Sequence, residues 1–158
     1  LVVGPWGARM GCLSMPCSVG RGGIGEKLGE GDGVSPKGHW HLTAVYYRPD
    51  REEQPCPGAV PIGLRDAWCD DPFDPHYNSF IQGDHGFPER LRRADPLYDL
   101  VGVLDFNMDP VRPHVGSAIF LHIWRAPRHP TAGCVAMARP DLRRVLAHLG
   151  LGGAVVIR

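Results

Sequence analysis

The pattern of apolar and polar positions predicts a mainly β protein. Residues His39 to Tyr47 are rich in aromatic and β-branched side chains, which is typical of a strand. Residues Tyr98 to Phe106 are almost wholly apolar, which indicates a central strand covered on both faces. Shorter runs at 9–15 and 154–157 add further strands to the expected sheet.

A strand is also expected from Ser117 to Trp124, where successive side chains point to opposite faces. The face expected in the core carries Ser117, Ile119, Leu121 and Ile123, and the opposite face carries Ala118, Phe120, His122 and Trp124. His122 therefore lies among aromatic side chains. A loop broken by prolines follows and leads to Gly133 and Cys134, which returns a thiol toward the face that carries His122.

A helical pattern occurs once, from Pro140 to Leu149. Proline suits the first turn, Asp141 favours the positive end of the helix dipole, and Gly150 is placed to end the helix. One apolar stripe is expected to pack against the sheet, and it consists of Leu142, Val145, Leu146 and Leu149. The predicted fold class is a mainly β domain with one short helix after Cys134.

Length and composition narrow the range of functions. The 158 residues fit a single domain, residues 1–158. Seventeen Lys and Arg balance seventeen Asp and Glu, which argues against a general nucleic-acid or acidic-membrane binder. No apolar run approaches the roughly 18 residues of a membrane helix, so no membrane span is expected. No internal repeat or heptad appears, and the oligomeric state is left open.

Two other regions were candidates for ligand sites. The glycine spacing of residues 20–38 is similar to that of a phosphate loop, but no buried strand precedes it, no helix follows it and no Gly-Lys-Ser/Thr occurs, so turns are predicted. His39 and His41 share one strand face, yet no third ligand has a telling spacing. We therefore expect neither a metal nor a cofactor.

The segment from 48 to 97 is expected to be mostly loop, with short strand-like runs at Ala59–Leu64 and Ser79–Gln82. An irregular region of this length in a compact domain is usually functional, as a lid or the wall of a groove.

Five cysteines leave at least one thiol unpaired. Cys56 and Cys69 bracket a short loop, as do Cys12 and Cys17, and either pair could form a disulfide in an oxidising compartment. Spacing alone does not fix the connectivity. Cys134 is the candidate for a free, reactive thiol.

Cys134 and His122 have the chemistry of a nucleophile and its base. A free thiol has a pKa of about 8.5, so it needs a partner to ionise at neutral pH. His122 can take the proton and return it to a leaving amine. Gly133 lets a substrate carbonyl approach the backbone, so the amides around Gly133 and Cys134 could form an oxyanion hole, while Thr131 orders the turn. The alternative is a buried cysteine and a core histidine without catalytic function.

This stretch resembles the catalytic motif of the L,D-transpeptidase (YkuD-type) family, in which a histidine ends a strand and a Ser/Thr-x-Gly-Cys element follows a loop. The matching elements are His122 and Thr131-Ala132-Gly133-Cys134. Further elements similar to a bacterial branch of the family occur in the expected order over about residues 17–157: Gly-Arg-Gly-Gly-Ile at 20–24, Lys…Glu-Gly-Asp-Gly…Pro-x-Gly at 27–38, Trp-Cys-Asp-Asp with Tyr-Asn at 68–78, Tyr-Asp-Leu at 98–100 and Gly-Ser-Ala-Ile-Phe-Leu-His at 116–122.

The chain departs from better-known members at two places. Those members have a histidine before the glycine and an arginine shortly after the cysteine. Ala132 stands at the first place, and Val135 and Ala136 stand at the second, with Arg139 further on. The departure concerns the part of the site that usually binds the donor peptide.

The resemblance implies a YkuD-like β-sandwich or mixed sheet and a peptidoglycan L,D-transpeptidase outside the cytoplasm, in the periplasm or an equivalent compartment. Cys134 would form a thioester with a stem peptide, and an amine acceptor would take the acyl group. Residues expected to contact the stem peptide are Tyr77, Asn78, Thr131 and Trp124. The resemblance also implies reaction with carbapenem-type β-lactams. Two alternatives are an L,D-carboxypeptidase or amide hydrolase acting on peptidoglycan peptides and a non-catalytic cell-wall-binding module.

Overall fold

Strands dominate the computed structural model, which describes residues 1–83 and 88–158. Its strands are β1 (Val2–Gly4), β2 (Gly7–Met10), β3 (Leu13–Met15), β4 (Cys17–Ser18), β5 (Ile24–Gly25), β6 (Ser35–Pro36), β7 (Gly38–Tyr47), β8 (Val60–Pro61), β9 (Asp66–Cys69), β10 (Ser79–Gln82), β11 (Glu89–Arg90), β12 (Leu100–Leu104), β13 (Phe120–Ile123), β14 (Val135–Met137) and β15 (Ala154–Ile157). The helix is α1 (Arg139–Leu149). The predicted mainly β class with one short helix is confirmed.

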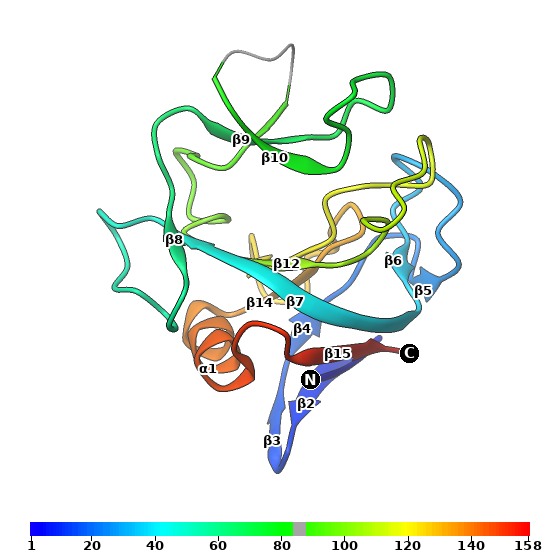
Figure 1. The fold of residues 1–158 in the computed structure, drawn as a ribbon. Coiled ribbons are helices and arrows are strands. Elements are labelled where there is room, and N and C mark those ends of the chain that lie inside the picture. The colour runs from blue at the N-terminus through cyan, green and yellow to red at the C-terminus, as the bar shows by residue number, and fades with distance from the viewer. Residues whose placement is uncertain (84–87) are drawn as a thin grey trace.

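One large mixed sheet organises the chain, in the order β3-β2-β1-β15-β7-β12-β13-β14-β4, with β8 beside β7. The pairs β1–β15, β13–β14 and β7–β8 are parallel, and the other pairs on this path are antiparallel. The long strand β7 pairs with β15 through its first residues and with β12 through the rest, so it joins the two halves of the sheet. Figure 1 shows β7 crossing the middle of the molecule, with α1 and β15 on one side and β9 and β10 on the other.

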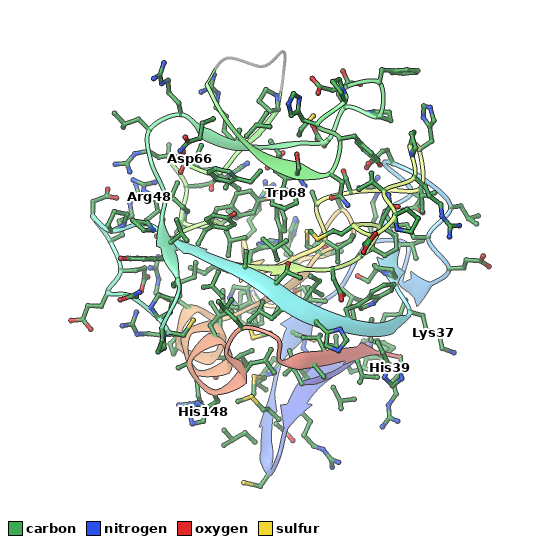
Figure 2. All side chains as sticks on the ribbon, viewed as in Figure 1. Lys37, His39, Arg48, Asp66, Trp68 and His148 are labelled. Atoms are coloured by element: carbon green, nitrogen blue, oxygen red, sulfur yellow. The ribbon has the colours of Figure 1, made fainter. Side chains whose placement is uncertain are left out.

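Apolar side chains cover the central strands on both faces. One cluster of buried residues packs α1 against the sheet and includes Leu42, Leu121 and Leu146. A second cluster on the other face includes Trp68, Val101 and Phe120. Burial on both faces explains why β12 reads as a continuous apolar run, as the sequence predicted. Trp68 projects from β9 toward the centre of the molecule (Figure 2).

The helix forms as its sequence pattern predicts, one residue longer at its start. Proline occupies the first turn, Asp141 lies near the positive end, and Gly150 caps the other end with a φ of 62°. Leu142, Val145 and Leu146 are fully buried, and Leu149 packs against the same cluster. No described helix is long and apolar enough to cross a membrane.

The segment from 48 to 97 contains more strand structure than the sequence predicted. The expected run at Ser79–Gln82 forms β10, but β10 pairs with β9, which the sequence did not indicate, and β11 completes a three-stranded sheet. All four residues of β9 are buried, so they give no alternating pattern. A face-to-face stack of Tyr46 and Phe80, with ring centroids 5.2 Å apart, joins this small sheet to β7.

All five cysteines are free thiols in this structure, so neither of the two possible disulfides is formed. Cys56 packs in the cluster beneath α1, whereas Cys69 packs with Ala67 and Ile81 in the small sheet. Cys12 is exposed at the turn between β2 and β3, and Cys17 is buried in β4. The members of each pair thus lie in different surroundings.

Candidate active site

Strand pairing brings Cys134 to the face that carries His122. The parallel strands β13 and β14 pair His122 with Ala136, and Cys134 lies two residues before Ala136, so its side chain shares that face. The amide N–H of Phe120 donates a hydrogen bond of 3.4 Å to Cys134 Sγ. Both residues line one cavity of about 420 Å³. The structure therefore unites the two residues that the sequence predicted as nucleophile and base.

His122 is held in the form that a general base requires. Its Nδ1 lies 2.8 Å from the carbonyl oxygen of Ile123, and because a carbonyl only accepts, Nδ1 carries the proton. No hydrogen bond to Nε2 occurs among the described residues, so its lone pair is available there. Burial lowers the pKa of His122 to about 4, so the imidazole is neutral at neutral pH. The ring of Tyr98 packs edge-on against it, with centroids 5.4 Å apart.

The thiol of Cys134 is protonated and bonded to the backbone at rest. Burial, and to a smaller extent the charge of Glu89, raise the pKa of Cys134 to about 12. A hydrogen bond from the Phe120 amide and the charge of Lys27 act in the opposite direction. The thiol donates to the carbonyl oxygen of Ala118 at 3.2 Å. Among the described residues, no hydrogen bond joins it to His122. Proton transfer to His122 therefore requires the thiol to leave Ala118.

The loop before Cys134 is fixed by its own side chains. The hydroxyl of Thr131 donates to the Cys134 carbonyl at 2.6 Å and accepts a hydrogen bond of 3.1 Å from the Gly133 amide. Ser35 Oγ donates to the Gly133 carbonyl at 2.7 Å. The Gly133 amide is thus occupied, which leaves the Cys134 amide for the expected oxyanion hole. Gly133 has a φ of 143°, and a Cβ there would lie 3.0 Å from the Val34 carbonyl oxygen.

Lys27 reaches the site from the glycine-rich segment that the sequence assigned to turns. Its side chain is 3 % exposed, and Nζ donates to Asp32 Oδ1 at 2.6 Å. A Cβ at Gly116 would lie only 2.3 Å from Lys27 Cε, and a Cβ at Gly133 would lie 3.5 Å from Lys27 Nζ. Gly116 therefore gives the lysine its space, whereas a Cβ at Gly133 would make only an ordinary contact with Nζ. Lys27, Gly133 and Cys134 line a second cavity of about 230 Å³.

The sequence predicts Asn78 in the wall of a substrate groove. In the structure Asn78 is instead buried behind the site. It is 3 % exposed and has a φ of 58°. Its Oδ1 accepts hydrogen bonds from Trp68 Nε1 and from the amide of Ala118, the residue whose carbonyl binds the Cys134 thiol. Its Nδ2 donates to two further carbonyls, those of Phe106 and Asn107. Asn78 thus positions the backbone next to Cys134.

Replacing Asn78 with alanine is expected to destabilise the fold by about 3 kcal/mol, since four buried or partly buried backbone and indole groups lose their partners and alanine disfavours a positive φ. Chemical denaturation would measure the change. Gln54→Ala is the control, because Gln54 Nε2 makes one hydrogen bond, to the Ala59 carbonyl. Equal effects of the two substitutions would contradict the positioning role of Asn78.

Tyr77 and Trp124 also lie away from the cavity walls that the sequence predicted for them. Tyr77 is buried, its hydroxyl donates to the Glu30 carboxylate, and the same oxygen accepts a 3.1 Å hydrogen bond from the Gly116 amide. Trp124 follows the end of β13 and is half-buried. Neither is among the described residues that line the two cavities at Cys134, whereas Thr131 is. Tyr77 therefore supports the backbone around Gly116.

The two cavities that meet at Cys134 differ in charge. Three arginines and one acidic residue, Glu89, line the larger cavity, and the arginines are Arg21, Arg93 and Arg125. Three acidic residues and Lys27 line the smaller one, and the acids are Glu30, Asp70 and Glu89. Arg21, Lys27, Glu30 and Asp70 fall within sequence elements similar to those of the family, whereas Glu89, Arg93 and Arg125 do not. Their spacing could not predict a shared cavity, because they come from four separate segments.

No cluster of three or more potential metal ligands occurs in residues 1–83 and 88–158. Of the two histidines considered from the sequence, His41 Nδ1 lies 3.0 Å from Asp105 Oδ2, and His39 lies at the exposed start of β7 (Figure 2).

The fold and the site define a mixed-sheet protein with a half-buried cysteine and a neutral histidine on one cavity. A family model described as "L,D-transpeptidase catalytic domain" (YkuD) matches residues 10–157, and the chain belongs to this family. Among solved structures, an L,D-transpeptidase from Mycobacterium smegmatis is similar, with 11 % sequence identity and a TM-score of 0.42, over 92 % of this chain and 48 % of that one. The chain thus spans about half the length of that protein. No curated protein matches it.

Proposed function

We propose that this protein is a peptidoglycan L,D-transpeptidase that uses Cys134 as nucleophile and His122 as base, in an extracytoplasmic compartment. The observation that carries the proposal is the neutral imidazole of His122 on the same cavity as the Cys134 thiol. Its Nδ1 is bonded to a carbonyl, and its Nε2 has no partner in residues 1–83 and 88–158. A histidine that served only as a core residue would gain nothing from an unpartnered Nε2.

The proposed reaction has two half-steps. His122 Nε2 takes the thiol proton as Cys134 Sγ attacks the carbonyl carbon of an L-centre–D-centre peptide bond in a stem peptide. The carbon–nitrogen bond breaks, the departing D-amino acid takes the proton from His122, and a thioester remains. An amine of a second stem peptide then attacks the thioester and gives its proton to His122, which returns it to Cys134.

Because both groups are neutral at rest, the proton has to move as the carbon–sulfur bond forms. Negative charge then develops on the substrate oxygen as well as on Sγ. In this proposal, Lys27 supplies the compensating positive charge, since it lines the cavity with Cys134 and its charge lowers the pKa of the thiol against the effect of burial.

The charged cavities suggest how the two peptides bind. The chain lacks an arginine directly after Cys134, but Arg21, Arg93 and Arg125 line the larger cavity. We assign the carboxylates of the donor peptide to this side, because guanidinium groups bind carboxylates bidentately. The acidic smaller cavity would then take the ammonium group of the acceptor.

The substitution Arg125→Gln is expected to raise the KM for a donor peptide with a free carboxylate about tenfold, because one charge-assisted hydrogen bond is lost. Initial rates at varied donor concentration would measure it. A donor peptide with an amidated carboxylate should not distinguish the two proteins, and Arg112→Gln is the matched control outside both cavities. An unchanged KM would remove Arg125 from the donor site.

Incubation with defined stem peptides tests the proposed function directly. Mass spectrometry should detect cross-linked dimers that require Cys134. Hydrolysed peptide without any dimer would instead establish the L,D-carboxypeptidase or hydrolase alternative. Binding to peptidoglycan without any turnover would favour the non-catalytic wall-binding module.

A further inference from the structure

Unpaired arginines gather on the side of the molecule that leads away from the larger cavity. Arg9, Arg21 and Arg128 form no ion pair with any residue in the described part of the chain. No acidic residue is among the described residues that line the two hollows on this side. Because the whole chain has a formal net charge of zero, this local excess of positive charge is a property of one face.

Trp6 stands exposed on the same side. It occupies the turn between β1 and β2, and 78 % of it is accessible to solvent. The turn belongs to the N-terminal strands at the end of the sheet beside β15 (Figure 1). An indole with an open face beside cationic side chains contributes nothing to the core, and such aromatic groups are typical of binding surfaces.

The hollows around Trp6 adjoin the active-site cavity through shared lining residues. Trp6 and Arg128 line both a hollow of about 510 Å³ and a neighbouring one of about 260 Å³. Arg21 and Pro130 line the second hollow and also the cavity of about 420 Å³ that contains Cys134. Adjacent hollows thus share lining residues from Trp6 to Cys134, and together we call them the groove.

We propose that this groove, defined by Trp6, Arg128 and Arg21, binds the polysaccharide strand to which the substrate peptides are attached. The indole of Trp6 would stack on the apolar face of a sugar ring, and the arginines would bind carboxylates of the peptides attached along the strand. The inference rests on the proposed function, because a stem peptide held at Cys134 must continue into its glycan strand. Charge complementarity favours this polymer, since the groove is cationic and the polymer carries carboxylates.

The test uses the substitution Cys134→Ala as background, so that the bound polymer is not altered. Co-sedimentation with purified, insoluble peptidoglycan should show about tenfold weaker binding after Trp6→Ala and a similar loss after Arg128→Gln. Phe73→Ala and Arg65→Gln are the matched controls, because both side chains are exposed and neither lines the groove. Binding should also weaken as salt concentration rises, because the arginine contacts are screened.

A second measurement separates this inference from the proposed function. In the protein with Cys134 intact, Trp6→Ala should raise the KM for polymeric peptidoglycan and leave turnover of short, sugar-free stem peptides unchanged. If binding depends on Trp6 but no acyl transfer occurs on any substrate, the result supports the glycan-binding groove and refutes the proposed transpeptidase function. If acyl transfer occurs and Trp6→Ala binds the polymer as tightly as the parent, the groove proposal is overturned. Equal loss with an unrelated anionic polymer such as polyglutamate would also overturn it, because simple charge would then account for the binding.

Discussion

Addition of a carbapenem is expected to increase the mass of this protein by one drug molecule, at Cys134 alone. The thiolate opens the β-lactam ring, the ring nitrogen takes the proton from His122, and the whole drug remains as a thioester. Intact-mass spectrometry before and after incubation measures the adduct. Replacing Cys134 with alanine should abolish the adduct and lower stem-peptide turnover by roughly four orders of magnitude.

The other four cysteines make this experiment specific. Cys12 is the exposed thiol, so a general alkylating reagent should modify it readily, whereas Cys17, Cys56 and Cys69 are buried. Cys12→Ser is therefore the matched control, and it should lose reaction with the alkylating reagent but keep the carbapenem adduct. An adduct that disappears in Cys12→Ser and persists in Cys134→Ala would place the reactive thiol in the wrong part of the molecule and refute the proposed nucleophile.

The same mass measurement, applied to a further variant, tests the role of His122 as base. His122→Gln should keep the hydrogen bond to Ile123, since its amide can donate, but it removes the base. Slow adduct formation in this variant, recovered as pH rises toward the pKa of the thiol, is the behaviour expected of a cysteine that has lost its proton acceptor.

The central residues of the site follow from local sequence pattern. Alternation from Ile119 onward puts Leu121 in one core and His122 on the opposite face, and the parallel partner strand repeats that alternation at Cys134. A period of two needs no knowledge of distant contacts, so it can be read from one segment. The observed strand β13, Phe120–Ile123, is nevertheless shorter than the predicted strand from Ser117 to Trp124. Ala118 adopts a φ of 52° and turns the chain before β13 begins.

The supporting residues could not be predicted in this way. Asn78 forms hydrogen bonds with groups 10 to 40 residues distant in sequence. These contacts bury a side chain that the sequence predicts in the wall of a groove, and they make it a support for the backbone. Strand β9 was missed because its four buried residues show no alternation. Lys27 lies among glycines that predict turns, and only the fold shows that Gly116 leaves space for its side chain. Each of these depends on contacts between distant segments.

Replacing Lys27 with methionine is expected to shift the alkylation of Cys134 to higher pH. A nearby positive charge favours the thiolate, so its removal raises the pKa of Cys134 further above the ordinary value. The charge of Lys27 is the smallest of the influences on this thiol, so the pKa should rise by about half a unit and the alkylation rate at a fixed pH should fall about threefold. Reaction with iodoacetamide in the Cys12→Ser background, followed from pH 6 to pH 11, measures the shift.

Controls separate charge from folding. Lys37, the chain's other lysine, is exposed and lies beside the start of β7 (Figure 2), so Lys37→Met should leave the alkylation profile unchanged. In the parent protein, hydrogen bonds from Lys27 and from the amides of Val34 and Leu28 hold the pKa of the Asp32 carboxyl at about 2 despite partial burial. The substitution Lys27→Met leaves this carboxylate without its charged partner. The double substitution Lys27→Met/Asp32→Asn removes this unpaired charge and should restore thermal stability.

The pH profile of alkylation in the double variant shows whether Lys27 acts on the Cys134 thiol or only on the loop that contains Asp32. A profile that stays shifted to high pH in a stably folded protein shows that the ammonium group acts on the thiol. A profile that coincides with that of the parent shows instead that Lys27 serves the loop through Asp32 alone, and the negative charge that develops in the reaction must then be balanced by the backbone amides around Cys134. Because Lys27 and Cys134 line the same cavity and the charge of Lys27 lowers the pKa of the thiol, we expect the first result.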